Sequence, residues 1–282
     1  MQRCQQKHTK MKRIHILSLF LLSILLTLYI TNVCYAQQPI SHPRYKLAWQ
    51  DDFRSSRLDT SRWSLIERGP SEWQKFMSPH KSLFRLRNGY IRLYARQNKD
   101  IDQNDTASYL TGGICTQHKK TFTYGKIEVR ARIHGATGCW PAIWIKSDDP
   151  KLWGYPERAE IDIMEYASHW TYVSQTMHSN YTDILKKTTN PKYQVLPKVD
   201  VSQWNVYGVE IRRDRVLLTV NGEVKLDYPK IDTNDVGQYP YGVESFLLID
   251  MQVGNKYLKE IIASEYPAWM DIDWVKVYEE AE

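Results

Sequence analysis

The chain is poor in cysteine, and its cysteines are unevenly placed. Two of the four lie within the first 34 residues, and only Cys115 and Cys139 lie beyond them. No cysteine or histidine spacing typical of a metal site occurs, although the chain has eight histidines. In an oxidising compartment Cys115 and Cys139 could pair, or they could remain two buried thiols, and the sequence leaves both possibilities open.

Helical periodicity, internal repeats, low-complexity tracts and Pro/Ser-rich linkers are also almost absent. The formal net charge is +6, but residues 1–36 hold five basic residues and no acidic one, which leaves 33 Lys and Arg against 32 Asp and Glu. No cluster of Lys and Arg with interleaved aromatic residues stands out in the remainder. We therefore expect no nucleic-acid partner.

The N-terminal segment has the order of a secretory signal. Basic residues up to Arg13 precede an apolar run over 14–30, and Ala36 supplies a small residue at the expected cleavage point. We predict a signal peptide over 1–36, a protein that is exported (secreted, periplasmic or at the cell surface), and no other contact with a membrane. Less favoured alternatives are an uncleaved membrane anchor, a lipoprotein modified at Cys34 and a start at Met11.

Strand-like runs recur through the rest of the chain, for which we predict a short linker over 37–44 and one domain over 45–279. Turn signals such as Asn88-Gly89 and Asn221-Gly222 separate the runs. The runs are 45–49, 82–86, 90–95, 125–133, 142–146, 174–178, 205–211, 215–220, 223–226, 246–253 and 270–278. Only 58–63 and 256–264 could be helical. This pattern predicts an all-β sandwich or jelly roll.

Glu160, Asp162 and Glu165 stand on an apolar, β-branched run of the kind that forms a buried strand. Because side chains alternate along a strand, Glu160 and Asp162 share one face and the intervening isoleucines fill the other. Strict alternation would send Glu165 to the apolar face, where an unpaired carboxylate is very costly. A β-bulge near Met164 would return Glu165 to the first face, which predicts a row of three acids.

Acids that alternate with apolar residues are also typical of a plain, half-solvated strand. The setting favours a site, because four tryptophans lie close by in the sequence: Trp140, Trp144, Trp153 and Trp170. Sugar rings stack on aromatic surfaces, and cleavage of a glycosidic bond needs one protonated and one ionised carboxyl group. With the bulge, the Cα atoms of Glu160 and Glu165 would lie roughly 13 Å apart, and inward-leaning side chains could approach the ~5–5.5 Å of a retaining pair.

These residues together resemble glycoside hydrolase family 16. The acidic motif follows Trp140-Pro-Ala-Ile-Trp144 and the strand 124–130, and the flanking motifs 49–53 and 270–278 agree as well. The resemblance spans 45–279, and its motifs occur in the family's order. The extra Met164 matches the bulged motif of laminarinase-like and agarase-like members rather than the shorter motif of lichenases and xyloglucan-active enzymes.

The resemblance implies a concanavalin A-like β-jelly roll with a concave substrate cleft. It further implies an endo-acting hydrolase that retains configuration, acts on a polysaccharide or oligosaccharide, and requires no cofactor for catalysis. By position in the motif, Glu160 would be the nucleophile, Glu165 the general acid/base, and Asp162 the carboxylate that tunes the pair. We expect a monomer.

Five further residues are predicted to bind substrate: Trp140, Trp144, His178, Trp73 and Arg68. The two tryptophans of the Trp-Pro-Ala-Ile-Trp motif resemble the family's cleft residues, although at least one could belong to the core. His178 falls on the strand beside the acidic one and could equally be structural, and Arg68 and Trp73 lie on an early loop. Many members bind a structural calcium on the convex side, and Asp273 matches the position of its acidic ligand. The nearby Asp271 and Asp52 could, like Asp273, be plain surface charges.

Two substrate classes remain open. One is β-1,3-glucan of the laminarin type, which the frequency of glucanases in the family favours slightly. The other is a β-galactosidic chain, such as an agar-like galactan or a poly-lactosamine region of a host O-glycan. Gly254-Asn255 stands where glucanase-like members often have Gly-Gly, and the loop 181–199 looks individual. A non-catalytic carbohydrate-binding jelly roll and a transglycosylase are the competing functions.

Overall fold

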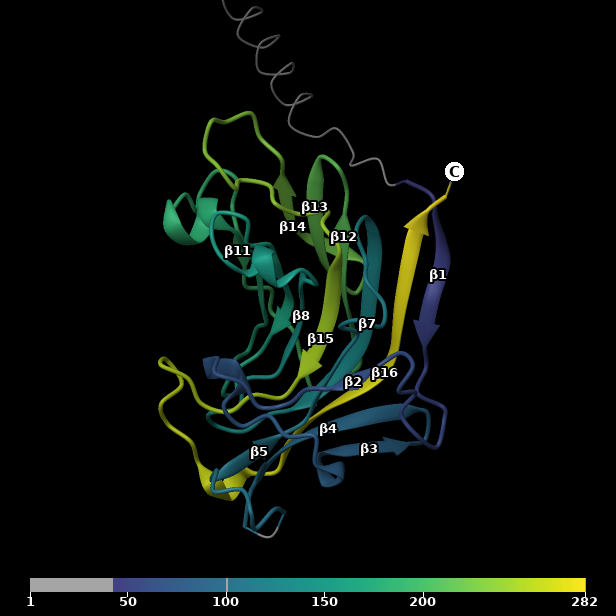
Figure 1. Ribbon diagram of the computed structural model, residues 1–282, viewed down its shortest axis with the longest axis vertical. Coiled ribbons are helices and arrows are strands. Elements are labelled where there is room, and N and C mark those ends of the chain that lie inside the picture. Colours follow the sequence, from purple (N-terminus) through teal and green to yellow (C-terminus); the bar gives the residue numbers. More distant parts are fainter. Residues whose placement is uncertain (1–42, 100, 282) are drawn as a thin grey trace, which may run out of the picture. The chain divides into compact units, whose positions relative to one another are not determined.

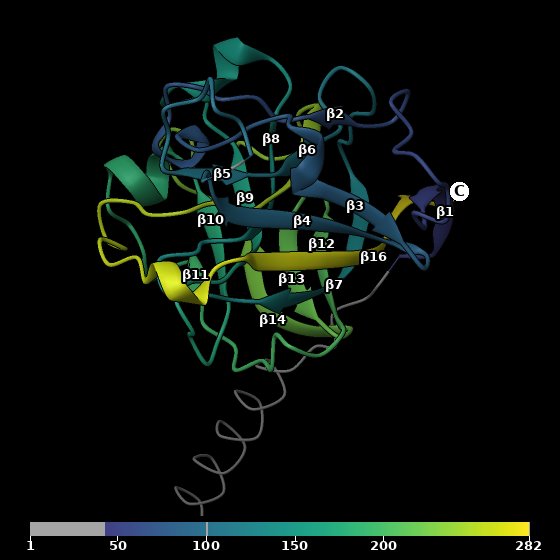
Figure 2. The same cartoon turned by 90° about the horizontal axis from the view of Figure 1, so that it is seen from below.

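Two antiparallel sheets make up the computed structural model, which describes residues 43–99 and 101–281 (Figure 1). The nine-stranded sheet has the order β14-β13-β12-β7-β16-β4-β3, with β1 paired to β16 and β5 to β4. Its strands are β1 (Tyr45–Asp51), β3 (Phe84–Arg87), β4 (Tyr90–Gln97), β5 (Tyr109–Thr111), β7 (Gly125–His134), β12 (Asn205–Ile211), β13 (Arg215–Val220), β14 (Glu223–Pro229) and β16 (Ala268–Glu280). Figure 2 shows β4, β16 and β7 side by side.

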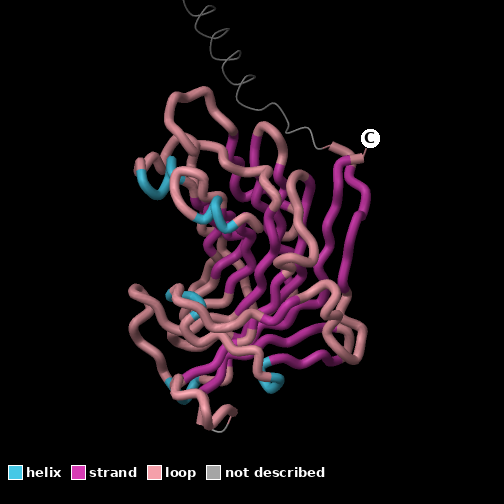
Figure 3. Tube along the Cα trace, viewed as in Figure 1, coloured by secondary structure: helices cyan, strands magenta, loops and turns pink. Residues whose placement is uncertain are grey.

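The seven-stranded sheet has the order β11-β10-β9-β8-β15-β6-β2. Its strands are β2 (Ser64–Leu65), β6 (Gly113–Cys115), β8 (Ala142–Ser147), β9 (Glu160–Glu165), β10 (Ser174–His178), β11 (Gln194–Val195) and β15 (Ser245–Asp250). Helical turns are short and lie in the connections (Figure 3): η1 (Glu72–Gln74), η2 (Lys81–Leu83), η3 (Pro150–Trp153), η4 (Asn180–Ile184) and η5 (Ala263–Glu265). The all-β sandwich expected from the strand-like runs is therefore confirmed.

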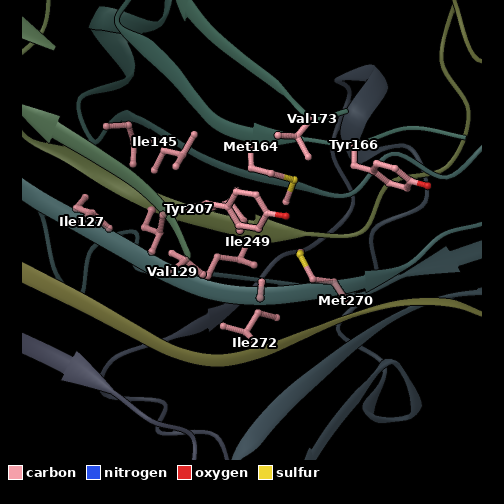
Figure 4. Packing of buried hydrophobic residues seen from close by; sticks show 14 of the residues in the cluster. Ile127, Val129, Ile145, Met164, Tyr166, Val173, Tyr207, Ile249, Met270 and Ile272 are labelled. Carbon is pink, nitrogen blue, oxygen red and sulfur yellow. The ribbon is translucent and has the colours of Figure 1, made fainter. Parts of the chain in front are cut away.

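The core lies between the two sheets and follows from alternation along the strands. In β7 every second residue is buried, from Ile127 to Ile133, while the residues between them are partly exposed. Figure 4 shows Ile127 and Val129 of this strand in the same cluster as Ile145 of β8 and Met164 of β9. The side chains on one face of β9 are thus buried in the core, and polar residues can occupy only its other face.

The outer face of the nine-stranded sheet carries ion pairs. Asp271 is fully buried, and its carboxylate accepts hydrogen bonds from Arg92 Nε at 2.6 Å and Arg132 Nε at 3.0 Å. Asp273, the predicted calcium ligand, pairs with Arg130. No group of three or more potential ligand side chains within the described part of the chain includes Asp273. A calcium ion at Asp273 stays a prediction.

Two expectations differ from the structure or lie outside the described residues, and the question left open for the two cysteines is answered. Neither of the two possible helices forms: 58–63 is a turn, and 256–264 is irregular up to η5, with Asn255 Oδ1 accepting the backbone N–H groups of Tyr257 and Leu258. Cys115 and Cys139 are both buried free thiols. The signal peptide over 1–36 and most of the linker over 37–44 lie outside the described residues. No helix in the described ranges is long and apolar enough to cross a membrane.

The buried face of β9 gives a first test of this fold. Ile161 is 1 % exposed, so we expect Ile161→Ala to lower the free energy of unfolding by about 2–5 kcal/mol, measured by urea denaturation. Ile184 is 54 % exposed, and Ile184→Ala should change stability by no more than about 0.5 kcal/mol. Equal effects of the two substitutions would contradict the assignment of this face to the core.

Candidate active site

A β-bulge in β9 places its three acids on one face. Ile143 of β8 pairs with Met164, but the next residue, Trp144, pairs with Asp162, and the register on the β10 side shifts in the same stretch. One extra residue is therefore accommodated between Asp162 and Glu165. The bulge predicted near Met164 is confirmed, and Met164 itself is buried in the core.

The three acids line a cleft of about 910 Å³. Its floor is the exposed face of the seven-stranded sheet, and its lips are formed by connecting segments, among them η4 and the loop that follows β15. Figure 3 shows loops and short helices on that side of the strands. The aromatic residues of the lining are Trp73, Trp140, Trp144, Tyr155, Trp170, Tyr193 and Tyr257. Such a cleft has the size and the mixed aromatic and polar lining of a ligand site.

Glu160 is held by a cation. Arg158 Nη2 donates to Oε1 of Glu160 at 2.9 Å and to Oε2 at 2.8 Å. Burial and the neighbouring carboxylate of Asp162 raise the pKa of Glu160, while Arg158 and His178 act in the opposite direction. The sequence reasoning missed Arg158, although it lies two residues before Glu160 and alternation could have placed it on the same side.

Glu165 has a neutral partner instead. Trp140 Nε1 donates a hydrogen bond to Glu165 Oε1 at 2.8 Å. Burial, followed by the charge of Asp162, raises the pKa of Glu165 to about 8, and the indole hydrogen bond only partly offsets this. Glu165 is therefore mainly protonated at neutral pH, whereas Glu160 has a guanidinium group that favours its ionised form.

Asp162, between these two acids, is the end of a hydrogen-bonded chain. His178 Nε2 lies 3.0 Å from Asp162 Oδ2, and His178 Nδ1 lies 3.0 Å from Asp183 Oδ1. The hydroxyl of Tyr155 donates to Asp183 Oδ2 at 2.5 Å. Burial alone would lower the pKa of His178, but Asp162 and Asp183 raise it well above its usual value. The ring is thus an imidazolium that donates from both nitrogens to the two carboxylates.

Glu160, Asp162 and His178 also form the only cluster of potential metal ligands found within the described residues, with ligand atoms within 4.8 Å of one another. The raised pKa of His178 bears on this reading, because a metal-ligating imidazole nitrogen must be free of its proton. The geometry shows a carboxylate against each ring nitrogen of His178, which is the contact set of a charge-paired histidine.

Trp144 belongs to the floor of the cleft rather than to an open stacking surface. Its side chain is 5 % exposed, its Nε1 donates to Asp250 Oδ2 at 2.8 Å, and Trp73 packs edge-on against it with ring centroids 4.9 Å apart. Asp250 also accepts from Gln252 Nε2 at 2.7 Å, and burial raises the pKa of this carboxyl to about 7.

The structure brings most of the predicted site residues together. Glu160, Asp162, Glu165, Trp140, Trp144, His178 and Trp73 all line the cleft. Arg68 does not, because Asp105 accepts two hydrogen bonds from its guanidinium group at 2.9 and 2.7 Å. Asp183, Tyr155 and Gln252 were not predicted, since no local pattern marks a residue whose partner lies on another loop.

Comparisons with known proteins agree with this geometry. The family model described as "Glycosyl hydrolases family 16" matches residues 80–275. A keratan-sulfate endo-1,4-beta-galactosidase of Sphingobacterium multivorum is 28 % identical over 83 % of this chain and 55 % of its own length. A glucan endo-1,3-beta-glucosidase A1 of Niallia circulans is 25 % identical over 83 % of this chain and 38 % of its own length. The chain thus spans about half or less of these two relatives.

A solved structure shows the same fold. The laminarinase from Flavobacterium sp. UMI-01 superposes with a TM-score of 0.70 at 25 % identity, and the match covers 83 % of this chain and 100 % of that one. The sandwich described above is therefore the jelly roll of this family's known structures.

The paired histidine allows a direct test. In Asp183→Asn the imidazolium of His178 loses one of its two carboxylates, so we expect the pKa of His178 to fall, measured by NMR of its ring signals against pH. Asp235 pairs with Lys187 instead, and Asp235→Asn should leave the His178 titration unchanged. An unaltered titration in Asp183→Asn would contradict the proposed charge pairing.

Proposed function

The chain belongs to glycosyl hydrolase family 16, a family of retaining glycoside hydrolases, and from this premise we propose that Glu160 and Glu165 carry out the double displacement of an endo-acting β-glycanase. The observation that carries the proposal is the bulge in β9, which puts both residues on the cleft face with different partners. Glu160 pairs with a guanidinium group and is the nucleophile. Glu165 has a pKa of about 8 and is the acid.

In the first step the carboxylate of Glu160 attacks the anomeric carbon, and the bond from that carbon to the glycosidic oxygen breaks. Glu165 gives its proton to the departing oxygen, so the leaving sugar departs as an alcohol. A covalent glycosyl ester of Glu160 remains. In the second step Glu165, now a carboxylate, takes a proton from water, and the water oxygen displaces Glu160 with overall retention.

Asp162 and His178 assist without exchanging protons in these steps. The negative charge of Asp162 contributes to the raised pKa of Glu165, which holds the acid ready to donate. His178, which contacts Asp162 at 3.0 Å, supplies a positive charge beside the carboxylates of the cleft floor. Asp183 positions His178.

For the substrate we favour a β-galactosidic chain, with laminarin-type β-1,3-glucan as the second candidate. Support comes from the keratan-sulfate-cleaving relative at 28 % identity and from Lys186 and Lys256, which line the cleft and have exposed side chains. Neither lysine is in a salt bridge within the described residues, and such ammonium groups suit a chain that carries anionic substituents. The glucan candidate is supported by the 25 % identical glucanase. Export through residues 1–36 is part of the proposal.

A panel of keratan-type, agar-type and laminarin-type glycans, analysed by product mass and linkage, tests this function. We expect shortened oligosaccharides from the keratan-type chain. Products from laminarin alone would favour the second candidate. Binding without cleavage would indicate a non-catalytic module, and products longer than the substrate would indicate transglycosylation.

Substitutions of the two glutamates test their roles. We expect Glu160→Gln to abolish hydrolysis and Glu165→Gln to lower kcat by about 10²–10⁴-fold, because general acid catalysis contributes that much. Circular dichroism should show both variants folded. Glu157 is exposed on the segment before β9, and Glu157→Gln is the matched control, with activity unchanged. Retained activity in Glu160→Gln would refute the assignment of the nucleophile.

The pH profile tests the acid independently. Because Glu165 must be protonated in the free enzyme, kcat/KM should fall as the pH rises through about 8, the pKa of this residue. The hydrogen bond from Trp140 lowers that pKa, so in Trp140→Phe the alkaline limb should move to higher pH, whatever happens to KM. A limb that stays in place or moves to lower pH would contradict the role of Glu165.

A further inference from the structure

A second pocket, of about 670 Å³, lies next to the cleft. It is formed by the end of β7 and by two connections, 166–171 after β9 and 198–202 before β12. Trp170 lines both this pocket and the cleft. The two hollows are therefore adjacent, with one tryptophan as the shared wall.

The wall that carries Trp170 is held in place by contacts outside the pocket. Ser168 and His169 both adopt positive φ values, 42° and 64°, which non-glycine residues rarely do. Ser168 Oγ accepts the backbone N–H of Gly138 at 2.8 Å, and His169 Nε2 lies 2.8 Å from Glu265 Oε2. The surroundings thus stabilise an unusual backbone that sets the position of Trp170.

The opposite wall is equally constrained. The backbone N–H of Ile133 in β7 donates to the carbonyl of Val201 at 2.7 Å. Asp200 Oδ1 accepts from the backbone N–H of Ser202 at 3.0 Å and from its hydroxyl at 2.6 Å. A pocket with both walls fixed in the free protein binds a ligand without first having to be ordered.

The lining has the chemistry that a sugar residue requires. Trp170 stacks one ring face on Tyr172, with centroids 4.9 Å apart and planes inclined by 21°. The ammonium group of Lys198 and the hydroxyl of Thr171 have no side-chain hydrogen bond or ion pair to the described residues. A sugar presents C–H groups to an aromatic ring and hydroxyl groups to polar side chains, and pockets of about 300–1,000 Å³ are typical ligand sites.

Trp170 lines both hollows, so a glycan bound in the cleft would reach the pocket past this residue. We propose that the pocket is a subsite for a further sugar residue of the bound glycan, reached past Trp170, either along the chain or as a branch. This inference rests on the proposed function.

The test fills the pocket without changing the cleft. Ser202 lines the pocket and is exposed, whereas the neighbouring exposed Gln203 does not line it. Ser202→Trp should lower kcat/KM on the long glycan that the panel identifies by about tenfold or more, as expected for the lost contacts of one sugar. It should leave the activity on an aryl monosaccharide, which has no second sugar residue to reach the pocket, unchanged. Gln203→Trp should behave as the unmodified protein on both substrates.

The outcomes separate the two proposals. Equal activity of Ser202→Trp and Gln203→Trp on the long glycan would overturn the subsite, as would an equal loss on both substrates. Linear and branched glycans compared side by side distinguish chain extension from a branch. If the unmodified protein cleaves nothing, the proposed function fails. The subsite is then tested by the crystal structure of Glu160→Gln soaked with keratan oligosaccharide. Sugar density against Lys198 and Thr171 would support it, and density confined to the cleft would overturn it.

Discussion

The extra residue accommodated between Asp162 and Glu165 is the constraint on which the site depends. Side chains of a regular strand alternate, so without the bulge Glu165 would lie in the apolar layer between the sheets, where an ionised carboxylate is very costly. The register shift is seen against both β8 and β10. The strands β8 and β10 therefore remain paired with β9 on either side of the bulge. The core beneath β9 stays continuous through Ile161, Ile163 and Met164.

Once three acids share one face, electrostatics determines how they differ. Burial and the charge of Asp162 raise the pKa values of Glu160 and Glu165, and the partner of each acid then sets the two apart. Glu160 has Arg158, Asp162 has His178, and Glu165 has only a neutral indole. The same strand thus carries one acid beside a guanidinium group and another that is largely protonated, which is the combination that cleavage with retention requires.

The connections that surround the sheet carry the rest of the recognition surface. Loops vary most among related folds and so adapt one scaffold to different ligands. Here they provide Tyr155 and Asp183 on one lip of the cleft, Tyr257 on the loop after β15, and Trp170 between the cleft and the second pocket. The positions of these residues depend on contacts between loops, such as that of His169 with Glu265.

The sequence by itself determined the features that depend on local backbone geometry. Alternation and turn residues predicted the sandwich, most strand positions and the bulge, because side-chain direction along a strand depends only on nearest neighbours. Only the tertiary structure decided which distant groups meet. The indole of Trp144 donates to Asp250 on another strand, and the guanidinium group of Arg68 donates to Asp105 instead of lining the cleft. A side chain's partner across loops depends on how every intervening segment folds, and no spacing along the chain encodes it.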